Sequence, residues 1–87
     1  MTDQNQSITL YGTTWCFDTR RARAIFEEMN IPYIWVDIDM DHQAREYVQR
    51  VNQGNRSVPT IVFPDGSILV EPENDALREK LSELSHS

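Results

Sequence analysis

Apolar and polar residues alternate along the chain with two different periods, which predict strands and helices in turn. Residues 7–11 alternate as a strand with one buried face does, and Gly12 is expected to end that strand. From Asp18 onward apolar residues recur at helical spacing, which predicts an amphipathic helix that ends near Asn30. Residues 31–38 are β-branched and aromatic, which predicts a second strand with both faces covered. This βαβ unit implies two parallel strands joined by a right-handed crossover.

A second helix is predicted in the middle of the chain. Asp39 and Asp41 both offer N-caps for this helix, and Gly54 is expected to stop it. Its predicted buried positions share the spacing of one helical face: Ala44, Tyr47, Val48 and Val51. The helix is therefore expected to pack through a single apolar stripe.

The last third of the chain is predicted to form a hairpin and a helix. Residues 60–63 and 67–70 are mostly apolar, and the Pro-Asp-Gly turn at 64–66 between them indicates a hairpin. Pro72 can open the final helix, whose apolar stripe is Leu77, Leu81 and Leu84. The order βαβ, helix, ββα predicts an α/β fold in which a four-stranded mixed sheet has helices on both faces.

Length and charge limit the classes of partner. A chain of 87 residues predicts one domain, 1–87, with frayed ends at 1–6 and 85–87. The net charge of −6 argues against nucleic acid or an anionic membrane as the partner. A single cysteine suits a reducing compartment, and neither a signal peptide nor a spanning segment is visible, so we expect a cytoplasmic protein.

Cys16 is the candidate nucleophile because it lies between the first predicted strand and the helix that follows. The exposed amides and the positive dipole end of a helix favour a thiolate at such a position. A buried, inert thiol is the alternative, since free cysteine often behaves as a small apolar core residue. The polar neighbours favour the reactive interpretation: Thr13, Thr14, Asp18 and Thr19.

Several segments together resemble the glutaredoxin family, most closely its mycoredoxin branch. These segments are YGTTWC at 11–16, RA at 21–22, GNRSVPTIVF at 54–63 and DG at 65–66. The resemblance covers most of the chain and implies a thioredoxin-like three-layer α/β/α fold. It also implies that Pro59 is cis and faces Cys16, which leaves the backbone of Val58 free to pair with the peptide-like backbone of a bound thiol.

The chain departs from the family pattern around the nucleophile. Dithiol members have Cys-x-x-Cys, whereas this chain has Cys16-Phe17-Asp18-Thr19, so only monothiol chemistry is available. Thr19 is expected to donate a hydroxyl hydrogen bond to the Cys16 thiolate. Thr13 stands where many members have a lysine, and Asp18 adds a negative charge that disfavours a neighbouring thiolate.

Other residues are expected to hold the partner of Cys16. Trp15 and Phe17 flank the thiol and would form an apolar rim, and Arg56 matches the family motif and would orient a carboxylate. Asp75 belongs to the Glu-Pro-Glu-Asn-Asp segment that replaces the family's usual Gly-Gly and Asp segment. Arg20 and Arg23 are interpreted as parts of a solvated helix face.

These observations favour a monomeric monothiol thiol-disulfide oxidoreductase without a tightly bound cofactor. Cys16 would reduce mixed disulfides of protein substrates, with glutathione, mycothiol or bacillithiol as the low-molecular-weight co-substrate. One alternative is an iron-sulfur carrier in which Cys16 of two subunits and two glutathiones hold the cluster, although such carriers usually have Cys-Gly-Phe-Ser. The other alternative is a binding module with this fold but without turnover. His42 and His86 are too few for a metal site with one cysteine.

Overall fold

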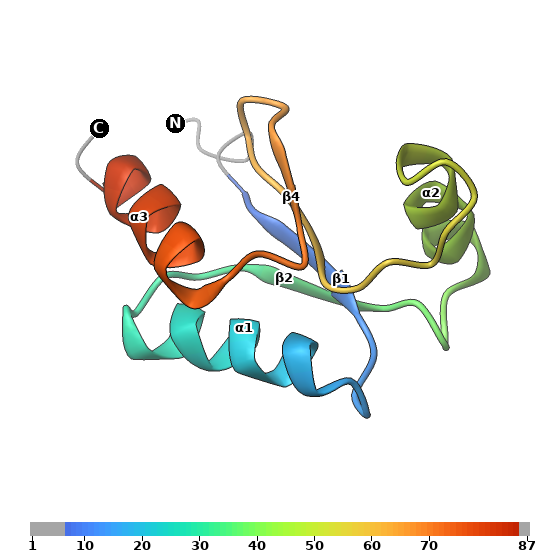
Figure 1. Ribbon diagram of the computed structural model, residues 1–87, viewed down its shortest axis with the longest axis horizontal. Helices are drawn as coiled ribbons and strands as arrows, with labels where there is room; N and C mark the ends of the chain where they lie inside the picture. Colours follow the sequence, from blue (N-terminus) through green and yellow to red (C-terminus); the bar gives the residue numbers. More distant parts are fainter. Residues whose placement is uncertain (1–6, 86–87) are drawn as a thin grey trace.

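The computed structural model of the protein describes residues 7–85, and its elements follow the predicted order (Figure 1). They are β1 (Thr9–Gly12), α1 (Phe17–Glu28), β2 (Ile34–Asp37), α2 (His42–Val51), β3 (Thr60–Val62), β4 (Ile68–Val70) and α3 (Asn74–Ser85). The fraying expected for residues 1–6 and 86–87 lies outside the described residues, whereas Ser85, also expected to fray, is the last residue of α3.

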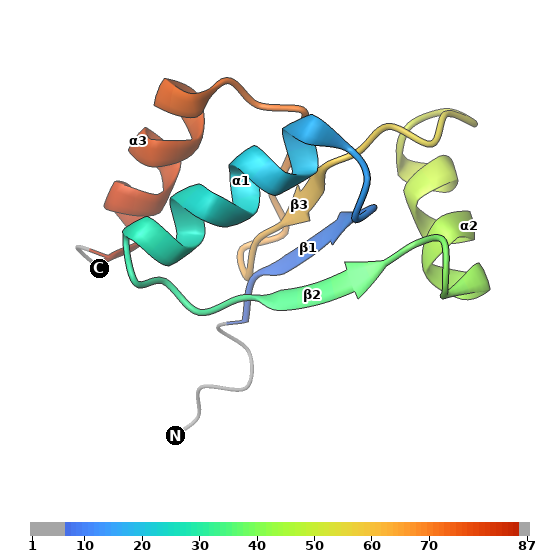
Figure 2. The ribbon, with the colours of Figure 1, turned by 90° about the horizontal axis from the view of Figure 1, so that it is seen from below.

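The four strands form one mixed sheet in the order β2-β1-β3-β4. Strand β1 pairs in parallel with β2, and the two run side by side in Figure 2. Strand β3 is antiparallel to both β1 and β4, so the Pro64–Gly66 turn closes the predicted hairpin. In that turn Asp65 accepts hydrogen bonds from the Ser67 hydroxyl and amide, which lower the pKa of the Asp65 carboxyl below its ordinary value.

Helices cover both faces of the sheet, as the pattern of apolar residues predicts. Helices α1 and α3 share one face, where they enclose the larger core with the inward residues of the strands: Ile8, Leu10, Ala22, Ile25, Phe26, Ile61, Phe63, Leu77 and Leu81. Helix α2 lies on the other face over a smaller core of Ile38, Ala44 and Val48. Figure 2 shows this division, which confirms the three-layer α/β/α architecture.

The strands are each shorter than predicted or begin later, most of all the second, which is predicted from Ile31 and observed from Ile34, and other element boundaries shift as well. Gly12 is the last residue of β1 because parallel pairing with Asp37 extends the strand. Helix α2 ends at Val51, three residues before Gly54, because Gln53 and Gly54 both have positive φ, 56° and 95°, and the Gly54 amide donates back to the Gln49 carbonyl. Helix α3 begins at Asn74, so Pro72 lies before the helix.

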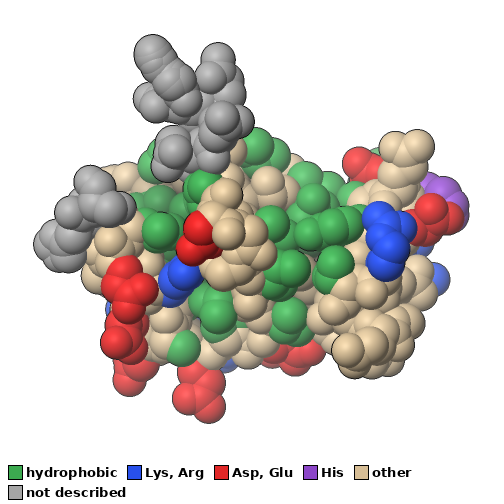
Figure 3. Space-filling model, turned by 90° about the horizontal axis from the view of Figure 1, so that it is seen from above, with side chains coloured by type: hydrophobic (Ala, Val, Ile, Leu, Met, Phe, Trp, Pro, Cys, Tyr) green, Lys and Arg blue, Asp and Glu red, His purple; other side chains and the backbone are tan. Residues whose placement is uncertain are grey.

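Helix α2 covers only part of its face of the sheet. Ile34 is 49% exposed, so the expectation that both faces of the second strand are covered is wrong at this residue. The reason is that β2 is an edge strand. Side chains alternate along a strand, and the register therefore places Ile34 and Ile68 on the face that α2 shares. Figure 3 shows apolar side chains gathered in the middle of one face of the molecule.

The helices of the described region are amphipathic and short. Within residues 7–85, none of them combines the length and the apolar character that crossing a bilayer requires.

Candidate active site

Cys16 lies in the turn between β1 and α1 and is the N-cap residue of the helix. Its backbone is extended, with φ −79° and ψ 125°, and its carbonyl accepts the Arg20 amide at 3.1 Å. The thiol makes no capping hydrogen bond to the first turn and is only partly buried. The sulfur therefore stands beside the amino end of α1, where the helix dipole favours an anion, and it is accessible to a reaction partner.

The Cys16 thiol meets the segment before β3. Its Sγ lies 3.9 Å from the carbonyl oxygen of Val58, 42 residues away in the sequence. The Val58–Pro59 peptide bond is cis, as the family resemblance implies. The Glu71 amide donates to the Pro59 carbonyl at 2.8 Å, and the Thr60 hydroxyl donates to the Ser57 carbonyl at 2.6 Å. These bonds hold the Val58–Pro59 segment beside the thiol.

The Thr19 side chain packs against Gly12 instead of bonding to the thiol. Thr19 is 0% exposed, and its Oγ1 has no hydrogen-bond partner among residues 7–85, so the predicted bond to Cys16 is not formed. A methyl group on Gly12 would lie only 2.5 Å from Thr19 Cγ2 and 2.7 Å from Oγ1. Glycine is therefore what allows β1 and the first turn of α1 to approach this closely. The buried Thr13 hydroxyl also lacks a partner within the described part of the chain.

Two aromatic side chains flank the thiol and stay largely in solvent. Trp15 is 69% exposed and Phe17 is 66% exposed. The Trp15 indole donates from Nε1 to Oδ2 of Asp39 at 2.8 Å, whereas the Phe17 ring lies under the Arg21 guanidinium at 5.6 Å. Each aromatic residue of the expected apolar rim therefore has a charged partner.

The negative charge next to the thiol is paired. Asp18 forms an ion pair with Arg21 at 3.1 Å, one turn further along α1. Both side chains are more than one third exposed, so solvent screens the pair. Because the Arg21 charge partly offsets that of Asp18, the thiolate experiences less repulsion than the sequence alone suggests.

Tyr11 packs on the α2 side of the sheet, beside the last residue of β1. Its ring lies 5.2 Å from the ring of Tyr47. Burial raises the pKa of Tyr11 above its ordinary value, and the nearby Tyr47 and Asp41 add to this effect. The Tyr11 phenol is therefore neutral at neutral pH and adds no negative charge.

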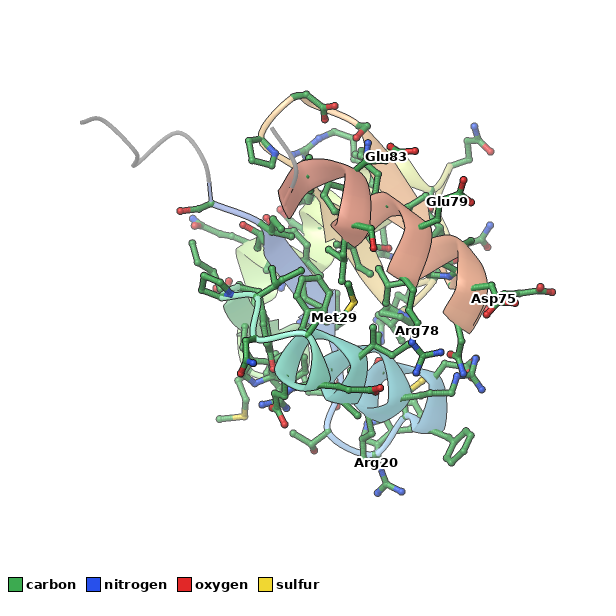
Figure 4. All side chains as sticks on the ribbon, turned by 90° about the vertical axis from the view of Figure 1, so that its left-hand side faces the viewer. Arg20, Met29, Asp75, Arg78, Glu79 and Glu83 are labelled. Carbon is green, nitrogen blue, oxygen red and sulfur yellow. The ribbon has the colours of Figure 1, made fainter. Side chains whose placement is uncertain are left out.

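Arg56 and Asp75 are both exposed, and no hydrogen bond or ion pair joins either to Cys16 within residues 7–85. Asp75 lies in the first turn of α3 and projects outward in Figure 4, as does Arg20 on α1. Arg78 instead reaches α1 and pairs with Glu28 at 3.2 Å. The structure thus brings Cys16, Val58 and Pro59 together and leaves Arg56 and Asp75 at the surface.

Asp39 belongs to the site, although the sequence pattern predicts it only as a candidate N-cap of the second helix. Asp41 alone caps α2, through Oδ1 and the Ala44 amide at 3.0 Å. Asp39 lies before the cap and binds the Trp15 indole. No local signal in the sequence indicates this pairing, because the two residues are 24 positions apart.

Among the described residues, no group of three or more histidine, cysteine or acidic side chains is arranged to hold a metal ion.

Comparisons with known proteins give relatives along most of the chain. The profile of the family described as Glutaredoxin matches residues 8–69. A Mycobacterium tuberculosis protein with a provisional glutaredoxin name is 39% identical over 79 residues, which cover 91% of this chain and 94% of that protein. Mycoredoxin 1 of Corynebacterium glutamicum is 36% identical over 67 residues, which cover 76% of this chain and 81% of that protein.

Solved structures share the architecture. The crystal structure of a thioredoxin-like protein superposes with a TM-score of 0.70 at 24% identity, covering 90% of this chain and 99% of the other. A glutaredoxin from Archaeoglobus fulgidus gives a TM-score of 0.67 at 21% identity, covering 94% and 88%. At such identities the likeness shows the thioredoxin-like fold alone.

Proposed function

The chain belongs to the glutaredoxin family, and we propose that within it the protein is a monothiol thiol-disulfide oxidoreductase. Its substrates are mixed disulfides between proteins and a low-molecular-weight thiol. The observation that carries this proposal is the position of the Cys16 sulfur at the amino end of α1, 3.9 Å from the carbonyl that precedes cis-Pro59. A thiol there can become a thiolate next to a backbone segment that can align a disulfide.

The first step transfers the small thiol to the protein. The Cys16 thiolate attacks the sulfur of the small thiol in the mixed disulfide, the S–S bond breaks, and the substrate protein leaves as a thiolate that takes a proton from water. A disulfide now joins Cys16 to the small thiol. The substrate cysteine is reduced, and Cys16 is oxidised by the same pair of electrons.

The second step regenerates Cys16. Because the sequence contains a single cysteine, no thiol of this chain can resolve the intermediate. A second small thiol from solution, as its thiolate, attacks the sulfur of the bound one, releases the Cys16 thiolate and forms the small-molecule disulfide. The rate of this step rises with the concentration of free thiol.

The surrounding residues hold the partner in place in this proposal. The Val58 backbone pairs with the peptide-like backbone of the bound thiol, beside cis-Pro59. Trp15 and Phe17 line the site with apolar surface. Arg56 and Asp75 are exposed and serve in this proposal as longer-range hydrogen-bond partners for the polar groups of the thiol. Thr19 acts in this proposal by packing: its buried side chain, whose Oγ1 has no hydrogen-bond partner within residues 7–85, lies against Gly12 and fixes the first turn of α1, which begins after Cys16.

Mycothiol is the co-substrate that we favour over glutathione and bacillithiol. The similarity to Mycoredoxin 1 supports this choice. The Glu71–Asp75 segment, which replaces the Gly-Gly and Asp segment usual in glutathione-binding members, supports it as well. We further propose that the protein acts as a monomer, without a tightly bound cofactor, in a reducing cytoplasm.

Intact mass spectrometry of the oxidised protein tests the proposal. The purified chain is exposed separately to the disulfides of mycothiol, bacillithiol and glutathione, with Cys16→Ser as the control. We expect one stable adduct per chain, formed fastest with mycothiol and removed by free mycothiol. Absence of an adduct with all three contradicts the proposal and favours the binding module. A brown dimer after anaerobic reconstitution with iron and sulfide would favour the iron-sulfur carrier.

A further inference from the structure

The Trp15 indole is fixed by one polar contact rather than by packing. The ring is 69% exposed, so the apolar core does not determine its orientation. Its Nε1–H donates to Asp39 Oδ2 at 2.8 Å. A hydrogen bond to a carboxylate is stronger than one between neutral groups. This bond therefore sets where the side chain next to Cys16 lies.

The acceptor is itself held in a tight turn. The Asp39 amide donates to Asp37 Oδ1 at 2.9 Å, and the Met40 amide donates to the Asp37 carbonyl at 3.0 Å. On one side of the turn, the Ile38 amide binds the carbonyl of Gly12, the last residue of β1, at 3.0 Å. On the other side, Asp41 caps α2. The turn that carries the Asp39 carboxylate is thus anchored at the carboxyl ends of strands β1 and β2, where the turn that contains Cys16 also begins.

Phe17, on the other side of the thiol, is held differently. Its charged partner is Arg21, which lies on the same helix and also pairs with Asp18. A contact within one helix does not tie the ring to another part of the fold. Trp15 is therefore the aromatic neighbour of Cys16 that is bonded across the fold, from the β1–α1 turn to the β2–α2 turn.

We propose that Asp39 is a positioning residue that holds the Trp15 indole as one wall of the Cys16 site, so that a disulfide with an apolar or aromatic group beside its sulfur is aligned for attack. The biological role of this contact rests on the proposed function. The contact itself can be tested through the reactivity of Cys16 alone. Because the ring is already ordered, binding a partner against it costs less conformational entropy.

The first test measures the bond itself. In a Trp35→Phe background, the single remaining indole N–H is followed by solvent-exchange NMR. We expect Asp39→Ala to speed the exchange of this N–H about three- to tenfold, in proportion to the loss of one net hydrogen bond. Asp39→Asn keeps an oxygen acceptor without the charge, so we expect it to preserve most of the protection. If Asp39→Ala leaves the exchange unchanged, the proposal is wrong.

The second test measures what the bond does for the thiol. Cys16 is reacted with two neutral reagents, dipyridyl disulfide, which is aromatic, and methyl methanethiosulfonate, which is small. We expect Asp39→Ala to slow the aromatic reagent about three- to tenfold, the range of a well-oriented aromatic contact, and to leave the small reagent unchanged. Trp15→Phe has the same effect because it lacks the donor, and the double variant is no slower than either single one.

The controls separate positioning from charge and from folding. Glu46→Gln removes one negative charge from α2, where Glu46 pairs with His42 at 2.9 Å, and we expect native rates. Equal slowing of both reagents by Asp39→Ala, or identical behaviour of Asp39→Asn and Asp39→Ala, overturns the proposal, because the charge or the thiol itself is then responsible. Failure of the proposed function is a separate result, namely absence of adducts with mixed disulfides when the reagent rates behave as expected.

Discussion

At the scale of single residues, the reactivity of Cys16 depends on three neighbouring groups that stabilise or destabilise its thiolate. The amino end of α1 favours the thiolate. Asp18 opposes it, and Arg21 pairs with Asp18 at 3.1 Å and so reduces that opposition. The helix terminus is therefore expected to prevail, and the thiol is expected to be reactive at neutral pH.

We predict that Cys16 reacts with iodoacetamide at neutral pH about two- to fivefold faster than a cysteine in an unstructured peptide of the same local sequence, the range of an exposed helix-dipole interaction. A pH–rate profile of alkylation measures this. A profile that coincides with that of the peptide contradicts the nucleophile interpretation.

The Asp18–Arg21 pair gives two variants with opposite expected effects. Asp18→Asn removes the repulsion and should speed alkylation, whereas Arg21→Ala exposes the carboxylate and should slow it. Because the pair is screened by solvent, we expect each change to be about twofold or less. The same pH–rate profile measures both variants, and equal rates in both would mean that the Asp18 carboxylate does not influence the sulfur.

Thr19 occupies the position of a resolving cysteine, and Thr19→Cys should create dithiol behaviour. The side chain is fully buried one helical turn after Cys16, and a thiol of similar size fits there. The native protein should stop as a stable mixed disulfide, whereas the variant should release the bound thiol spontaneously and become two hydrogens lighter than its dithiol form. Intact mass spectrometry over time measures the release.

Thr19→Ser is the matched control for this experiment. It keeps a hydroxyl at the same position and cannot form a disulfide, so its adduct should persist. Release of the bound thiol by native protein at a rate independent of thiol concentration would contradict the monothiol mechanism.

At the scale of secondary structure, the position of Cys16 depends on how closely α1 approaches β1. Gly12 ends β1, and the Thr19 side chain packs against its Cα from the first turn of α1. The cis-Pro59 segment is held on the other side by the Glu71 amide, which follows β4. The site is therefore a junction of β1, α1 and the start of β3, and the packing of these elements sets its geometry.

Gly12→Ala should destabilise the protein by about 1–3 kcal/mol, the usual cost of an added methyl group in a filled space. The new methyl group would lie 2.5 Å from Thr19 Cγ2, which forces the first turn of α1 outward. Urea denaturation followed by circular dichroism measures the free energy of unfolding.

The double variant Gly12→Ala/Thr19→Ala tests the stated cause. Thr19→Ala removes the two atoms that lie nearest to the new methyl group, Cγ2 and Oγ1, and leaves only Cβ at 3.2 Å, so the double variant should lose less stability than the sum of the two single changes. If the two losses simply add, the contact with Thr19 is not the reason for the glycine.

At the scale of the whole molecule, acidic residues dominate the electrostatic potential. The net charge is −6, and two carboxylates lie next to the Cys16 turn: Asp18, which is paired with Arg21, and Asp39, which binds Trp15. Such a field repels an attacking thiolate that carries further negative charges more strongly than one whose only charge is on its sulfur. This is a further physical reason to expect a neutral sugar thiol as the partner in place of anionic glutathione.

The rate at which small thiols reduce the Cys16 mixed disulfide should therefore depend on salt according to their charge. The attacking thiolate of glutathione carries a net charge of about −2, that of an otherwise neutral thiol −1, and that of cysteamine about zero, so we expect added sodium chloride to speed reduction by glutathione most, by the neutral thiol less, and by cysteamine least. Stopped-flow rates at low and high ionic strength measure this. An identical salt dependence for all three thiols would show that the overall field does not reach the site.

Much of the fold is predictable because its signals are local. Helical spacing identifies α1, α2 and α3, and the Pro-Asp-Gly turn identifies the hairpin. The exact boundaries are less predictable: pairing with Asp37 extends β1 to Gly12, and α2 ends at Val51 because the backbone already turns to a positive φ at Gln53. Ile34 is exposed because its strand lies at the edge of the sheet, which no local pattern reveals.

The sequence by itself determined the order of the elements, the place of the single thiol at the start of a helix, and the family. The reason is that periodicity and short motifs depend only on residues that are close together in the chain. The tertiary structure alone decided which groups meet that thiol. Val58 reaches it from 42 residues away, Asp39 binds Trp15 across 24 residues, and Thr19 turns to Gly12 instead of the sulfur. Such contacts depend on the packing of the whole chain, since residues distant in sequence are brought together only when their elements share a sheet edge or a helix end.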